Sequence, residues 1–102
     1  MTLAYIIEHA QNFPWNFALY LPRNSEWTRD TPATVLDPND CADDEEDPPL
    51  AMANDLRCAL SIQEIQSVVE NARQQLSRPG GDELFRAFKY YFDHDAFIKF
   101  DR

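Results

Sequence analysis

Apolar and polar residues recur with two different periods along the chain, so the pattern predicts helices together with strands. Thr2 can cap a first helix that ends before Pro14, because its apolar residues recur at helical spacing: Leu3, Ile6, Ile7 and Ala10. Residues 16–21 alternate as a strand does, and Pro22 stops them. A second, shorter strand is expected at residues 34–36.

The clearest helical pattern lies between Ser61 and Leu76. Ser61 and Glu64 have the spacing of a capping box, in which each side chain satisfies a free backbone N–H of the other residue. An apolar stripe follows: Ile62, Ile65, Val68, Val69, Ala72 and Leu76.

A last helix is expected after the break at Pro79-Gly80-Gly81, starting at Gly81 or Asp82 and ending at residues 93–95. Its apolar face is aromatic and is expected in the core: Leu84, Phe85, Phe88, Tyr91 and Phe92.

Two segments have shorter patterns. Residues 56–60 fit either a strand or the lead-in to the helix that follows, because five residues do not define a period. Residues 96–100 alternate and are predicted as a C-terminal strand. Helices and strands are mixed without a βαβ rhythm, so we expect an α+β fold in which about three helices pack on one side of a small antiparallel sheet.

The composition fits one soluble domain spanning residues 1–102. Of the 102 residues 44% are hydrophobic, and the seven Phe, four Tyr and two Trp supply much of the area that a single core can bury. Cys41 and Cys58 have no spacing typical of a disulfide framework or a zinc site. The N-terminus lacks a basic leader, and no apolar run approaches the roughly 20 residues that span a bilayer. A cytoplasmic protein is expected.

The negative charge is concentrated in an acidic loop at residues 37–49, which Pro48-Pro49 closes. Of 18 carboxylates seven lie in this loop, which contains no Lys, Arg or His; the rest of the chain has 11 acids against 9 bases. Such a block repels itself and stays hydrated, so it is expected to be exposed and to attract basic partners. Its acids are Asp37, Asp40, Asp43, Asp44, Glu45, Glu46 and Asp47.

This loop does not match a known metal or catalytic motif. An EF-hand alignment that starts at Asp37 puts Ala42 at the obligatory glycine, and one that starts at Asp43 puts Pro48 there. Solvated carboxylates stay ionised and are poor general acids. We therefore expect no metal and no cofactor. The nine bases are scattered and the net charge of −9 repels phosphate, which disfavours nucleic-acid binding.

His94 and Cys58 could belong to a Cys-His-Asp site, which would make the protein a small hydrolase. The simpler interpretation is that His94 lies at a helix C-terminus, where the dipole favours a cation, and that Cys58 is a small buried hydrophobe. His9 is expected on the surface. Gly80-Gly81 belongs to no nucleotide-binding pattern and is interpreted as helix punctuation.

The chain resembles the small acidic immunity proteins of bacterial contact-dependent growth inhibition and related polymorphic toxin systems. The features that carry this resemblance are Trp27, Thr34-Val35-Leu36-Asp37 before the acidic loop, Ser61-Ile62-Gln63-Glu64-Ile65-Gln66 with Asn71-Ala72, Phe88-Lys89-Tyr90-Tyr91, and Asp95-Ala96-Phe97-Ile98.

The resemblance implies a non-enzymatic protein that binds and neutralises a toxin domain, with a basic nuclease as the expected toxin. A groove shaped for phosphates accepts a row of carboxylates, so the acidic loop and the neighbouring Trp27 are the candidate partner-binding residues. The alternative is a cytoplasmic adaptor or regulatory module, in which the acidic loop is only a solvated spacer.

Overall fold

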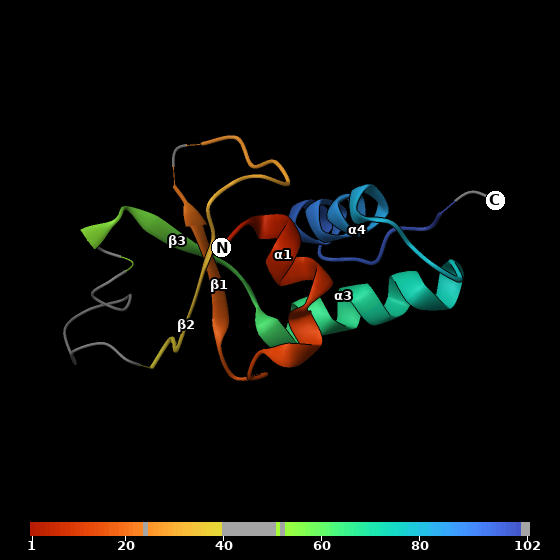
Figure 1. Ribbon diagram of the computed structural model, residues 1–102, viewed down its shortest axis with the longest axis horizontal. Helices are drawn as coiled ribbons and strands as arrows, with labels where there is room; N and C mark the ends of the chain where they lie inside the picture. Colours follow the sequence, from red (N-terminus) through yellow and green to blue (C-terminus); the bar gives the residue numbers. More distant parts are fainter. Residues whose placement is uncertain (24, 40–50, 52, 101–102) are drawn as a thin grey trace.

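Three antiparallel strands form a sheet in the order β2-β1-β3, and the helices lie on one side of it (Figure 1). The computed structural model describes residues 1–23, 25–39, 51 and 53–100. The strands are β1 (Ala18–Pro22), β2 (Thr34–Leu36) and β3 (Leu56–Ser61). The expected α+β fold with a small antiparallel sheet is confirmed, and residues 56–60 form a strand.

The central strand β1 is covered on both faces. Leu19 and Leu21 pack into the main core, whereas Ala18 and Tyr20 form a second cluster with the fully buried Ala51. The predicted alternation of this strand is therefore correct, but both of its faces are apolar. On the second face Ala51 packs on the strand together with the partly buried Leu36 and Leu56. The strand also includes Pro22, which the sequence pattern placed outside it.

The helical elements are α1 (Leu3–Glu8), the short 3₁₀ turn η1 (Ala10–Asn12), α3 (Ile62–Gln75) and α4 (Gly81–His94). Their ends confirm the predicted caps. The Thr2 hydroxyl accepts a hydrogen bond from the Tyr5 N–H at 3.2 Å. At α3 the Glu64 N–H donates to the Ser61 hydroxyl at 3.1 Å, and the Ser61 N–H donates to the Glu64 carboxylate at 3.0 Å.

The core is made where α1, α3 and α4 pack against one another and on the sheet. Phe88, predicted in the core, is completely buried, and Phe85, Tyr91 and Phe92 are partly buried against the cluster. The predicted stripe of α3 is buried at Ile62, Ile65, Val68, Val69 and Ala72. Burying each such aliphatic side chain stabilises the fold by roughly 1.5–3 kcal/mol.

The predicted strand at 96–100 is wrong, because this segment joins no sheet. It runs beside α3, where the side-chain amide of Gln75 makes hydrogen bonds that a neighbouring strand would otherwise make. The Gln75 Nε2 donates to the Ile98 carbonyl at 2.7 Å, and its Oε1 accepts from the Phe100 N–H at 2.9 Å. One side chain thus satisfies two backbone groups that a strand would have paired in a sheet.

Within the described residues, no helix is both long and apolar enough to cross a membrane.

Candidate functional site

The acidic loop begins directly after β2. Asp37 is half-buried, and its carboxylate accepts a hydrogen bond from the Asn39 N–H at 3.0 Å, which fixes the turn that leaves the sheet. The other six carboxylates of the predicted site lie outside the described residues: Asp40, Asp43, Asp44, Glu45, Glu46 and Asp47.

The sheet anchors both flanks of the acidic loop. β2 precedes the loop and β3 follows it, and these are the two edge strands on either side of β1. Leu36 pairs with Ala18 at one end of β1, whereas Leu56 pairs with Pro22 at the other end. Ala51, between the loop and β3, is fully buried against the face of β1 that points away from the helices. Both points of attachment therefore belong to the paired strands and the buried face of the sheet.

Trp27, the aromatic residue of the predicted site, makes its contacts mainly inside the molecule. Its side chain is 9% exposed, its indole N–H donates to the Pro22 carbonyl at 2.9 Å, and its ring meets Phe92 edge-on with centroids 4.8 Å apart. Little of Trp27 is accessible to a partner, so direct binding through Trp27 stays a prediction while its packing role is observed.

A hollow that the sequence did not predict lies over Trp27 and Phe92. The Arg57 guanidinium is 5.9 Å from the Trp27 ring centroid and 5.4 Å from that of Phe92. The Lys89 ammonium is 5.9 Å and 5.7 Å from the same two centroids. With Arg23 these residues line a space of about 240 Å³, here named the cation–aromatic hollow. Its members are far apart in the sequence, which is why no local motif indicated it.

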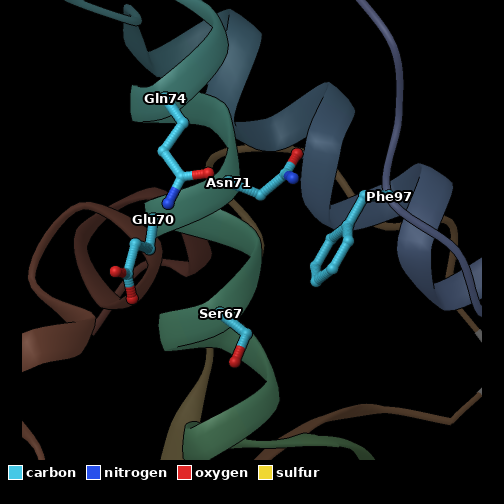
Figure 2. Close-up of a pocket in the computed structure, with 5 residues that line it drawn as sticks. All are labelled: Ser67, Glu70, Asn71, Gln74 and Phe97. Carbon is cyan, nitrogen blue, oxygen red and sulfur yellow. The ribbon is translucent and has the colours of Figure 1, made fainter.

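A polar pocket of about 200 Å³ lies between α3 and the C-terminal segment (Figure 2). Figure 2 shows Ser67, Glu70, Asn71 and Gln74 along α3, with the Phe97 ring facing them. The Ser67 hydroxyl donates to the Gln63 carbonyl at 3.1 Å, so it is held by its own helix. The pocket offers hydrogen-bonding groups to a peptide or a solvent molecule, and its lining contains no histidine that could activate Ser67.

Beside this pocket, Tyr91 packs against Phe97 with ring centroids 5.4 Å apart. Burial raises the pKa of the Tyr91 phenol above its ordinary value of 10.0, and the negative charges of Glu64 and Asp95 and a hydrogen bond with Glu64 raise it further. The Tyr91 phenol is therefore neutral at physiological pH. It is a hydrogen-bonding group at the edge of the core.

The candidate residues of the hydrolase hypothesis lie on different elements. Cys58 is on β3 and is exposed, so the expectation that it is buried is wrong. The reason is that β3 is an edge strand whose register with β1 shifts between Leu19 and Tyr20. His94 is the last residue of α4, as expected, and its ring lies 4.4 Å from that of Tyr90. His9 is exposed, as predicted, and its Nδ1 donates a hydrogen bond to the Tyr5 carbonyl at 2.8 Å.

In the part of the chain that the structure describes, no three His, Cys, Asp or Glu side chains gather in a way that could hold a metal ion.

The fold defines a small α+β domain in which the acidic residues 37–49 stand in the sequence between the edge strands β2 and β3. The chain belongs to the family described as "Domain of unknown function (DUF7716)", which matches residues 1–100. No curated protein and no solved structure matches it.

Proposed function

We propose that this protein is a non-enzymatic immunity protein that binds a bacterial toxin domain in the cytoplasm and neutralises it by blocking its active site. A basic nuclease is the expected toxin. The observation that carries the proposal is the charge distribution: seven carboxylates in eleven residues, in the part of the sequence that connects the two edge strands of the sheet.

The spacing of these carboxylates supports a nuclease as the partner. An extended chain advances by at most about 3.3–3.6 Å per residue, and one strand of DNA carries one phosphate per roughly 3.4 Å of helix axis. A groove that binds phosphates therefore meets a comparable row of charges. Complementary fields raise the association rate by roughly 10 to 1,000-fold, which suits an inhibitor that must act before the toxin does.

The test compares two double variants with the same loss of charge. Asp44→Asn with Glu45→Gln removes two charges from the acidic loop, and Asp30→Asn with Glu8→Gln removes two from exposed positions elsewhere. A basic protein captured from the native lysate at low salt is identified, purified and mixed with each variant in stopped-flow measurements.

The loop variant should associate several-fold more slowly at low salt, and neutralising all six of residues 40, 43, 44, 45, 46 and 47 should slow association by about tenfold or more. Both loop variants should keep the wild-type melting temperature, because the sequence predicts that these carboxylates are solvated, and solvated carboxylates contribute little to stability. Equal slowing in the Asp30 and Glu8 control would show that the association rate depends on the net charge of the protein and not on the acidic loop. Unchanged kinetics in the sixfold variant would leave the loop as a spacer and favour the adaptor function.

A further inference from the structure

The cation–aromatic hollow is lined mainly by cations, although the whole protein is acidic. Three of the nine cations of the chain line it, Arg23, Arg57 and Lys89, against the single carboxylate of Glu26. They come from the end of β1, from β3 and from α4, so the fold brings them together over large sequence separations. Asp55 and Asp93 pair with two of these cations, so what the hollow offers an anion is the third cation, Arg57.

Arg57 is the cation of the hollow that is ready for a ligand. Arg23 pairs with Asp55 at 3.3 Å, and Lys89 pairs with Asp93 at 3.1 Å, and both acids lie outside the lining. Among the described residues, no carboxylate lies within ion-pair distance of Arg57, whose guanidinium rests against the rings of Trp27 and Phe92. This support holds the planar donor group in place, which reduces the entropy lost on binding.

The size and lining of the hollow indicate which anion it accepts. Ligand pockets for small molecules have about 300–1,000 Å³, whereas this space of about 240 Å³ suits one side chain of a larger partner. The guanidinium fork of Arg57 matches a carboxylate through two parallel hydrogen bonds. Glu26 in the lining repels a doubly charged phosphate more strongly than a singly charged carboxylate, and the lining includes no helix N-terminus of the kind that binds phosphate.

We propose that the cation–aromatic hollow is a binding site for an acidic side chain of a protein partner, with Arg57 as the residue that contacts its carboxylate. The site is separate from the acidic loop, and it stands whether or not the partner is a toxin.

The test uses Trp27 as the reporter. The chain has two tryptophans, so Trp15→Phe, at an exposed position, leaves Trp27 as the only one. The full-length protein with this change is titrated with the blocked peptide acetyl-Ala-Ala-Glu-Ala-Ala-amide at constant ionic strength. The neutral peptide with Gln in place of Glu, and inorganic phosphate, are titrated in parallel while Trp27 fluorescence is recorded.

We expect a saturable change with the Glu peptide and none with the Gln peptide. Arg57→Gln should weaken binding by about tenfold or more, since the carboxylate loses its charge-assisted hydrogen bonds. Arg57→Lys, which keeps the charge but lacks the fork, should weaken it less. The matched control is Arg73→Gln, which removes the same charge from an exposed position on α3 and should change binding less than twofold.

Equal responses to the Glu and Gln peptides would overturn the proposal, as would equal weakening by Arg57→Gln and Arg73→Gln or the absence of saturation at millimolar peptide. Phosphate binding more tightly than the Glu peptide would also overturn it, because the site would then select phosphate.

Discussion

Single polar side chains decide where several elements of this fold begin and end. Ser61 and Glu64 join the last residue of β3 to the first turn of α3 through reciprocal hydrogen bonds. Asp95 ends α4 in a left-handed conformation with a φ of 53°, which Asp tolerates better than most residues. These caps can be identified from the sequence because they depend on residues three or four positions apart.

Ser61→Ala should lower the free energy of unfolding by about 1 kcal/mol, because the Glu64 N–H loses its acceptor at the start of α3. Ser67→Ala is the matched control on the same helix. The Ser67 hydroxyl bonds back to the Gln63 carbonyl and is exposed, so its loss should cost less than about 0.5 kcal/mol. Urea denaturation of the two variants measures the difference. Equal costs would contradict the capping role of Ser61.

The raised pKa of Tyr91 predicts a loss of stability at alkaline pH. Below pH 10 the phenol is protonated in both states, so the preference of the fold for the neutral form is fully present. Above the unfolded pKa of 10.0 the unfolded chain loses this proton while the folded chain keeps it. The free energy of unfolding therefore decreases until the pH passes the folded pKa. The melting temperature should therefore fall as pH rises through 10 toward the folded pKa.

Tyr91→Phe should make this alkaline fall in melting temperature shallower, since Phe has no proton to lose. The variant should also be less stable at pH 7, because it lacks the hydrogen bond with Glu64. Tyr5→Phe, at an exposed position of α1, is the control and should keep the wild-type slope. A wild-type slope in Tyr91→Phe would show that other groups cause the fall.

At the scale of whole elements, the sequence predicted what local periodicity determines. The helices and the first two strands follow from apolar spacing and caps. The errors come from long-range contacts: residues 96–100 alternate as a strand would, yet Gln75 binds their backbone. Cys58 is exposed because its strand lies at the sheet edge. The cation–aromatic hollow could not be predicted, since Trp27, Arg57 and Lys89 meet only in the folded chain.

Gln75→Ala should release the C-terminal segment from α3. The Phe100 N–H and the Ile98 carbonyl both lose their partner, which should cost roughly 1–3 kcal/mol for half-buried groups. Amide hydrogen exchange at Phe100 should speed up more than exchange in α3 itself. Gln74→Ala, one position away and exposed, should leave exchange at Phe100 unchanged. Unaltered protection in Gln75→Ala would mean that apolar packing of Ile98 and Phe100 alone holds this segment.

At the scale of the whole molecule, the acidic loop and Arg57 present opposite charges to a partner, and both are joined to one sheet. The acidic loop is attached at Leu36 and Leu56, and Arg57 of the cation–aromatic hollow follows Leu56 directly. A partner that presents basic residues to the loop and an acidic residue to the hollow would bind in one orientation, because the reversed arrangement places like charges together. Under both proposals, the acidic loop raises the rate of association and the cation–aromatic hollow fixes the orientation of the bound partner.

The proposed neutralisation by occupancy predicts stoichiometric protection. A blocker needs surface complementarity and no group that transfers protons, so titrating the protein against its toxin should end near an equimolar ratio. Cys58→Ser and His94→Ala change an exposed strand residue and an exposed helix terminus, so both should fold and protect cells that carry the toxin as the wild type does. An enzyme that destroys the toxin would instead work far below equimolar amounts and would lose its effect on replacement of its reactive residue. Complete inactivation at about a hundredth of the toxin concentration would exceed any 1:1 binding limit and would establish catalysis in place of blocking.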